Sequence, residues 1–144
     1  MMLSSFLRPL LCAALLAPCA AFAEDPEAVY RKFHAAMVAG DLEAMKPYML
    51  TARRAEIEQT PEKDRRAIIQ FMQALTPKAI TIERQTIAED GQSAALEARG
   101  IGKALIGEGE DPMIGAVRMV REDGAWRVDT SHWKSEPKEE GAKQ

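Results

Sequence analysis

Residues 113–133 read MIGAVRMVREDGAWRVDTSHW, and this stretch near the end of the chain decides the fold. Two runs rich in apolar and β-branched residues, 113–122 and 125–133, lie on either side of Asp123-Gly124. Asp-Gly between two such runs is the strongest short-range indication of a β-hairpin, because its turn needs residues that accept a positive φ. The stretch therefore predicts two antiparallel strands joined by a two-residue turn.

The register of this hairpin follows from the turn. If Glu122 faces Ala125, the pairs that follow fall alternately on the two faces of the sheet. One face then holds Arg121–Trp126, Met119–Val128, Val117–Thr130 and Gly115–His132, and the other holds Val120–Arg127, Arg118–Asp129, Ala116–Ser131 and Ile114–Trp133. The opposite charges of Arg118 and Asp129 support this register.

A second hairpin is predicted before the first. Residues 79–88 and 92–104 are also β-rich and flank Asp90-Gly91, and a two-residue turn there sets Arg84 opposite Glu97. Such cross-strand pairs stabilise antiparallel strands. The second half of the chain is thus expected to form about four antiparallel strands.

The first half of the chain has helical spacing instead. Asp25 and Pro26 are typical of a helix start, and Gly40 is typical of a left-handed helix end. The apolar face between them is predicted to carry Val29, Phe33 and Met37, with Tyr30 and His34 on the adjoining stripe.

Two further helical segments follow. Asp41 is expected to cap the first, which Pro47 should kink or divide because its ring cannot donate to the helix ladder. Thr60 is expected to cap the second, with Pro61 in its first turn and Thr76-Pro77 ending it. This last helix is predicted to turn Ile68, Ile69, Met72 and Leu75 inward.

Helices followed by strands predict an α+β fold, with the N-terminal helices packed on one face of an antiparallel sheet. Within this pattern, Gly40-Asp41-Leu42-Glu43-Ala44 and residues 122–128 resemble the nuclear transport factor 2-like (NTF2-like), or cystatin-like, superfamily. The likeness is greatest to its small exported bacterial lumazine-binding-like domains and covers roughly residues 26–133. It implies a cone in which a curved sheet wraps around a long helix and encloses an apolar pocket.

The first 23 residues resemble a secretory signal peptide. A short basic start and a brief apolar stretch lead to Ala21-Phe22-Ala23, which predicts cleavage after Ala23 and a periplasmic or secreted protein. The apolar run is shorter than the roughly 20 residues that span a membrane, so no stable insertion is expected. A lipoprotein signal at Cys19 is the alternative, which Pro18 fits badly.

The rest of the chain is then expected to be one domain, residues 24–134, with a disordered polar tail at 135–144. Both cysteines lie in the predicted signal peptide, so we expect no disulfide in the exported protein. The chain carries 19 Lys+Arg against 22 Asp+Glu, and this mild acidity argues against binding nucleic acid, which needs clustered positive charge.

The sequence predicts neither a metal site nor a cofactor. A closed zinc site needs four ligands, and the only histidines are His34 and His132. Asp129, Ser131 and His132 resemble a catalytic triad in composition but lie on one predicted strand, where side chains alternate between faces. They cannot all converge on one substrate.

We therefore expect a non-enzymatic domain that binds a small apolar ligand, or a partner protein, in or around the cone. The candidate pocket residues are Tyr30, Phe33, His34, Met37, Trp126, Thr130 and His132.

Two alternatives stay open. The resemblance to ketosteroid isomerases and SnoaL-like cyclases implies an isomerase or dehydratase, with a pocket histidine as base because no inward carboxylate is predicted. A homodimeric structural or assembly module of the cell envelope is the other, through the apolar residues Ile114, Val120 and Trp133 on the outer sheet face.

Overall fold

A computed structural model of the protein describes residues 24–104 and 108–137. Its elements are α1 (Pro26–Ala39), α2 (Leu42–Met45), a 3-10 helix η1 (Lys46–Tyr48), α3 (Thr51–Gln59), α4 (Glu62–Leu75), β1 (Ala79–Ile87), β2 (Ser93–Lys103), β3 (Glu110–Glu122) and β4 (Ala125–Ser135). The strands form one antiparallel sheet in the order β1-β2-β3-β4. The predicted α+β class and its four strands are confirmed.

Several expectations fall on the ends of the chain. The predicted signal peptide, with both cysteines, and the tail from residue 138 lie outside the described residues. The start of the predicted tail belongs to the folded part, because β4 runs to Ser135 and Glu136 forms an ion pair with Arg99. Within the described part of the chain, no helix has the length and apolar character needed to cross a membrane.

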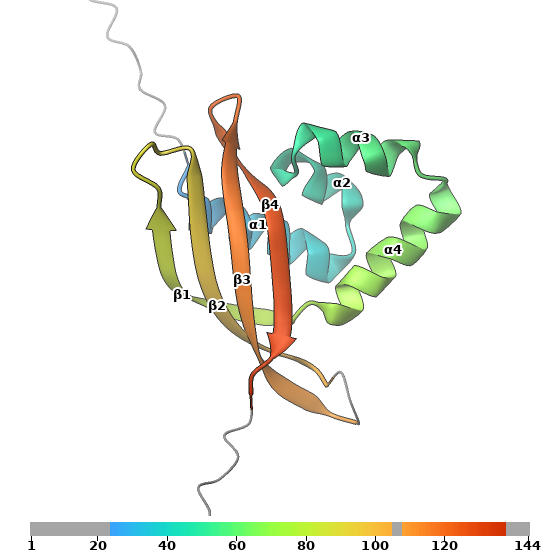
Figure 1. The fold of residues 1–144 in the computed structure, drawn as a ribbon. Helices are drawn as coiled ribbons and strands as arrows, with labels where there is room; N and C mark the ends of the chain where they lie inside the picture. The colour runs from blue at the N-terminus through green and yellow to red at the C-terminus, as the bar shows by residue number, and fades with distance from the viewer. Residues whose placement is uncertain (1–23, 105–107, 138–144) are drawn as a thin grey trace, which may run out of the picture.

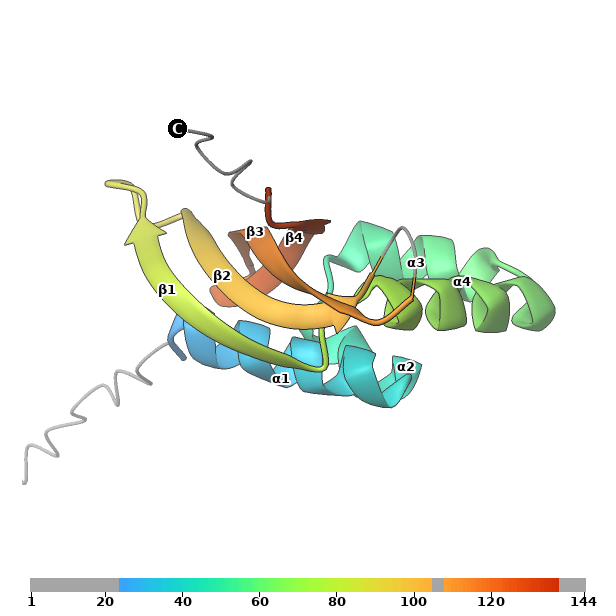
Figure 2. The same ribbon diagram turned by 90° about the horizontal axis from the view of Figure 1, so that it is seen from below.

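The helices occupy two places relative to the curved sheet. α1 lies against one face of the sheet, whereas α3 and α4 stand beyond the edge formed by β4 (Figures 1 and 2). The face that packs on α1, here called the inner face, carries Leu96, Val117 and Met119, which are almost completely buried. They form one core with Val29, Phe33 and other residues of α1. Each large apolar side chain buried there contributes about 1.5–3 kcal/mol.

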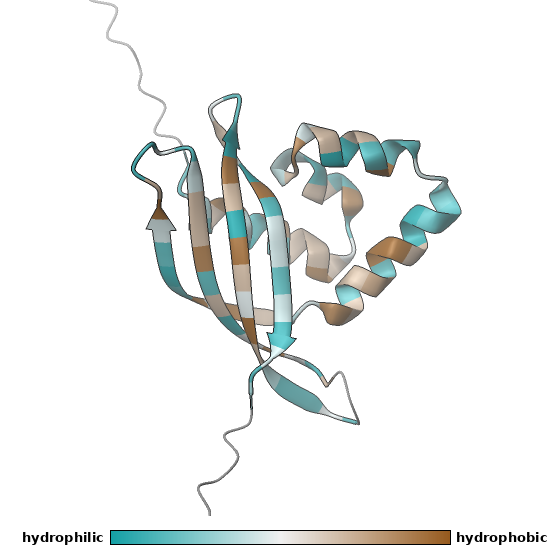
Figure 3. Cartoon of the chain, in the orientation of Figure 1, coloured by the Kyte–Doolittle hydropathy of each residue, from teal (hydrophilic) through white to brown (hydrophobic). Residues whose placement is uncertain are grey.

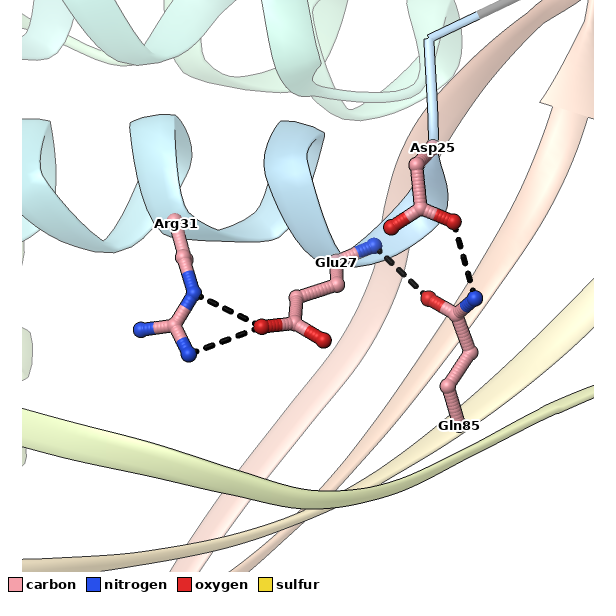
Figure 4. Close-up of polar contacts among 4 residues, drawn as sticks. All are labelled: Asp25, Glu27, Arg31 and Gln85. Atoms are coloured by element: carbon pink, nitrogen blue, oxygen red, sulfur yellow. Dashed lines mark hydrogen bonds and ion pairs between the residues drawn. The ribbon is translucent and has the colours of Figure 1, made fainter.

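The start of α1 is held by β1. Asp25 stands at the N-cap position, as predicted, but its carboxylate accepts no hydrogen bond from the helix. Instead, the Gln85 amide oxygen accepts from the Glu27 backbone N–H at 2.9 Å, and its nitrogen donates to Asp25 at 2.8 Å (Figure 4). A side chain from a distant strand thus satisfies a free donor of the first turn.

The predicted end of α1 and start of α2 are confirmed. Gly40 adopts a φ of 67°, and the Asp41 carboxylate accepts from the Ala44 N–H at 3.0 Å. Pro47 divides the next segment into α2 and η1, as expected. After it, Met49 pairs with Val128 in an isolated parallel bridge, so this segment covers part of the free edge of β4.

α3 and α4 differ from their prediction in two ways. Thr60 ends α3 rather than capping α4, and its hydroxyl donates to the Glu56 carbonyl. In α4 only Ile69 is buried, while the other three residues predicted to face inward, Ile68, Met72 and Leu75, are exposed. The helix ends at Thr76-Pro77, as predicted.

The β3–β4 hairpin begins as predicted and then changes register. Asp123 and Gly124 form the two-residue turn with φ values of 53° and 77°, and the pairs from Glu122–Ala125 to Met119–Val128 are the expected ones. Arg118 then pairs with Thr130, which leaves Asp129 as an extra residue in a β-bulge. Arg118 and Asp129 still form the predicted ion pair, with N and O 3.5 Å apart.

This bulge exchanges the faces of the residues that follow it. Ser131 pairs with Val117 and Trp133 with Gly115, so both lie on the inner face. Thr130 and His132, predicted to point inward, lie on the outer face and are exposed. The predicted pairs after the bulge are therefore wrong by one residue, because a bulge shifts every later position to the opposite face.

The β1–β2 pairing also has the predicted register next to its turn and shifts further along the strands. Arg84 faces Glu97 as predicted and forms an exposed ion pair with it. A register shift at Glu83 then separates this part of β1 from the part that carries Ile80 and Ile82. Both isoleucines pack against the core. The turn is longer than predicted, because Ala88 is hydrogen-bonded to Ser93 and four residues lie between them.

Candidate functional site

A cleft of about 540 Å³ opens between α1, α3, α4 and the edge of β4. Its volume lies in the range of about 300–1,000 Å³ that is typical of small-molecule sites. Its apolar lining comes from all four helices, and its polar lining comes from residues 129–132 of β4 and from the helical side, including Tyr30, His34, Arg53 and Glu56. The cleft exists because α4 stands away from the sheet and Met49 covers β4 only as far as the bulge.

One wall of the cleft is the exposed apolar side of α4. Ile68, Met72 and Leu75 line it, and their exposed fractions are 44%, 39% and 39%. Figure 3 shows hydrophobic segments recurring along α4 beside the open side of the sheet. Exposed contiguous apolar surface beside a concave site usually marks a binding surface.

Methionines supply much of the remaining lining. Met37, Met45 and Met49 line the cleft from α1, α2 and the segment after η1, and Met72 faces them from α4. Methionine side chains are unbranched and polarisable, so they adapt to ligands of different shapes.

The inner end of the cleft is polar. The Tyr30 hydroxyl and the Ser131 hydroxyl are 2.9 Å apart and hydrogen-bonded, although Tyr30 is only 1% exposed. Burial raises the pKa of the Tyr30 phenol, and its polar neighbours Ser131 and Trp133 act in the opposite direction. The Trp133 indole N–H is buried beside them and makes no hydrogen bond of normal geometry to the described residues.

His34 stands one helical turn after Tyr30 and also lines the cleft. Its Nε2 lies 2.8 Å from the Pro77 carbonyl oxygen, so this nitrogen must carry the proton and donate. Burial lowers the pKa of His34 below its ordinary value of 6.5, which the hydrogen bond to Pro77 opposes. His34 is thus a neutral imidazole near pH 7, with Nδ1 as its basic nitrogen.

The charged residues of the lining have partners. Arg53 and Glu56 of α3 form an ion pair at 2.9 Å, and Asp129 pairs with Arg118. Among residues 24–104 and 108–137, no group of three or more potential ligands could hold a metal ion. The cleft therefore combines an apolar body with a small uncharged polar end.

Most of the predicted pocket residues border this cleft. Tyr30, Phe33, His34 and Met37 line it from α1, and Thr130 and His132 border it where the edge of β4 meets the opening. Trp126 is not among the lining residues. It is buried near the hairpin turn, where the Arg121 guanidinium lies 4.8 Å from its ring centre in a cation–π contact.

The predicted dimer residues do not share a face. Ile114 and Val120 lie on the outer face, opposite Lys134 and Arg127, whereas the bulge turns Trp133 inward. Gly115 makes room for this ring, because a Cβ atom there would lie 2.7 Å from the indole. Trp133 also lies beside His34, with ring centres 6.5 Å apart. A homodimer stays a prediction, now without Trp133 on the proposed surface.

Other cleft residues were not foreseen as site residues. Ser131 was assigned to the outer face because the sequence carries no mark of the bulge. Ile57, Met45 and Met49 follow the helical spacing, but that spacing does not show which apolar side chains line an opening. The sequence predicts that Ile68, Met72 and Leu75 turn inward with Ile69, whereas they are exposed and line the cleft.

The sequence matches no protein-family model and no curated protein. A solved SEC-C motif-containing protein from Rhodopseudomonas palustris is similar in structure, with a TM-score of 0.54 and 17% identity over 74% of this chain and 77% of that one. At this level of identity, the likeness concerns the fold alone.

NTF2-like proteins are also among the similar structures. One is a protein of unknown function from Shewanella oneidensis, with a TM-score of 0.48 and 13% identity over 74% of this chain and 93% of that one. Another is a proposed dehydratase from Streptomyces avermitilis, with a TM-score of 0.49 and 12% identity over 78% of this chain and 94% of that one. These two NTF2-like proteins are among the solved structures that this chain resembles, and the lumazine-binding-like detail stays a prediction.

Proposed function

We propose that this protein is an exported, non-enzymatic binding module that holds a small apolar ligand in the cleft between α1, α3, α4 and β4. The observation that carries the proposal is the position of α4, which presents Ile68, Met72 and Leu75 to an opening instead of to the core. Exposing such a surface is unfavourable in water, and a ligand that covers it gains about 25 cal/mol for each Å² of apolar area buried.

The polar inner end of the cleft favours a small ligand over a protein surface. A partner protein would cover Ile68, Met72 and Leu75 without reaching Tyr30, which is only 1% exposed. A small molecule that enters the cleft can contact both the apolar wall and the hydroxyls of Tyr30 and Ser131. This is the usual composition of a ligand site, where a few polar groups fix orientation in an apolar pocket.

The neutral fluorescent probe N-phenyl-1-naphthylamine tests the proposal, because its emission rises when it enters an apolar site. We expect saturable binding to residues 24–144. Met72→Trp should abolish it by filling the cleft, while Phe71→Trp should bind normally, since Phe71 lies on the same helix but does not line the cleft. Absence of binding to the unaltered protein, or equal binding by both variants, would contradict the proposal.

Native mass spectrometry of protein purified from its source organism tests export and natural occupancy together. A polypeptide mass matching residues 24–144 supports cleavage after Ala23, and retention of residues 1–23 contradicts it. A small-molecule adduct would supply the natural ligand. A dimer mass would support the predicted homodimer instead.

An isomerase or dehydratase is the second proposal, and one observation favours it. His34 is neutral, and its Nε2 is held by Pro77, which leaves Nδ1 able to accept a proton. His132 lies on the outer face and borders the cleft only at the edge of β4, so the proposal assigns the base to His34 alone. Enzymatic turnover of a compound identified in the cleft that is lost in His34→Gln would support this proposal, whereas unchanged turnover in the variant would end it.

A further inference from the structure

The hydroxyl groups of Tyr30 and Ser131 in the cleft together have one O–H that donates to no acceptor. Tyr30 and Ser131 each carry one O–H, and their mutual hydrogen bond at 2.9 Å uses one of the two, whichever residue donates. The remaining O–H has no partner among the hydrogen bonds of the described residues. Both side chains line the cleft, so the unused donor is available to a molecule that enters it.

The same end of the cleft offers no charge to pair with a ligand. His34 is neutral because its pKa is lowered, and Tyr30 is protonated because its pKa is raised. The nearest full charges of the lining are already paired, Arg53 with Glu56 and Asp129 with Arg118. A carboxylate or an ammonium group placed beside Tyr30 would lose its hydration without gaining an opposite charge, which is strongly unfavourable.

We propose that the ligand of this cleft is an uncharged amphiphile: an apolar chain or ring system with one neutral oxygen, such as a ketone, ester or alcohol oxygen, that accepts a hydrogen bond from the Tyr30–Ser131 pair. This inference rests on the proposed function and adds the chemical class of the ligand. The pair selects the head group through hydrogen bonding and through the cost of burying a charge there.

The apolar part of the ligand is selected less strictly. Four methionines line the body of the cleft, and such side chains adapt to different shapes. Ligands that share the neutral oxygen but differ in the shape of the tail should therefore bind with similar affinities.

Displacement of N-phenyl-1-naphthylamine at pH 7.5 tests the inference with three probes of equal chain length: 2-decanone, decanoate and decylamine, the last of which is a cation at this pH. Each is used below its aggregation concentration. We expect 2-decanone to displace the dye at a concentration about tenfold lower than either ion. Decanoate or decylamine that matches 2-decanone would overturn the inference while leaving the proposed function intact.

Two variants connect this preference to the hydroxyl pair. Tyr30→Phe combined with Ser131→Ala should reduce the preference for 2-decanone about threefold or more, because it removes both O–H groups and leaves the apolar lining. Thr81→Val, at an exposed position of β1 that does not line the cleft, is the control and should preserve the preference. Either single variant would leave one O–H free, so if the double variant does not fold, the carbonyl stretching frequency of 2-decanone bound to the unaltered protein gives the second test. A hydrogen bond from the pair should lower this frequency below its value in hexane, and an equal value would overturn the role of the pair. An unchanged preference in the folded variant would overturn the role of the pair, and dye that never binds would instead remove the proposed function.

Discussion

α1 and α4 are both fourteen residues long and both amphipathic, yet α1 buries seven residues and α4 buries one. The apolar side of α1 lies against the inner face of the sheet, whereas that of α4 faces a cleft beyond the sheet edge. Helical spacing of apolar residues therefore indicates that a face avoids water, but not what covers it. In this protein the covered helix supports the fold, and the uncovered helix presents an exposed apolar surface to the cleft.

Phenylalanine to alanine substitutions should show the largest difference between the two helices. Phe33 of α1 is 7% exposed and Phe71 of α4 is 65% exposed. Phe33→Ala should destabilise the protein by about 3–5 kcal/mol, because it opens a cavity in the core. Phe71→Ala should change the free energy of unfolding by about 0.5 kcal/mol or less. Urea unfolding of both variants measures the difference, and equal effects would show that α4 is packed after all.

The next effect concerns the sheet surface that packs on α1. Gly115→Ala places a Cβ atom 2.7 Å from the Trp133 ring, and Trp133 in turn lies beside His34 of α1. We expect a loss of about 1–3 kcal/mol in the free energy of unfolding, together with a shifted tryptophan emission. Ala116→Val, one residue along on the outer face, should be nearly neutral. A neutral Gly115→Ala would contradict the inward position of Trp133.

A smaller effect should follow from removing the cap of α1. Gln85→Ala leaves the Glu27 N–H without its acceptor, and losing such a cap typically costs about 1 kcal/mol. Amide hydrogen exchange should quicken in the first turn of α1 and stay unchanged in α4, whose N-cap residue Pro61 makes no side-chain cap bond. Thr86→Ala, at the next and exposed position of β1, is the control, and equal exchange in both variants would contradict the cap.

The last difference is one of pH dependence. The pKa of His34 is lower in the folded protein than its ordinary value of 6.5, so below that pH the unfolded chain binds a proton more readily than the folded one. Stability should therefore be complete above pH 6.5 and fall as the pH decreases through and below this value. His34→Gln can still donate to Pro77 but does not titrate, so its melting temperature should fall less than that of the unaltered protein between pH 7.5 and 5.5. An equal fall in both would contradict this role of His34.

The sequence predicted several features that depend on neighbouring residues, although the cap at Thr60 and the length of the turn at Asp90-Gly91 were wrong. Asp123-Gly124, Gly40-Asp41, Pro47 and Thr76-Pro77 each act through their own φ angles or their own backbone groups, and each was placed correctly. The hairpin register was also right up to the Asp129 bulge, because it is counted from the turn.

Features that depend on distant residues were not predictable in this way. Gln85 caps α1 from a position 58 residues away from Glu27, and nothing in either local pattern connects them. The bulge at Asp129 is compatible with the same alternation of residue types as a regular strand. The position of α4 depends on how far the chain between Met49 and Pro61 holds it from the sheet. The predicted residues of α1 therefore line the cleft, whereas Thr130 and His132 border it from the outer face of β4 and not from the predicted inner face.

The extra residue at Asp129 also has a genetic consequence. Loss of its single codon would let β4 pair regularly with β3, and Ser131 would still face Val117 and Trp133 would still face Gly115 on the inner face. The hydroxyl pair of Tyr30 and Ser131 would keep its place, and the Arg118–Asp129 ion pair would be lost. The bulge thus lets β4 absorb a one-codon deletion that, in a regular strand, would turn every later side chain to the opposite face.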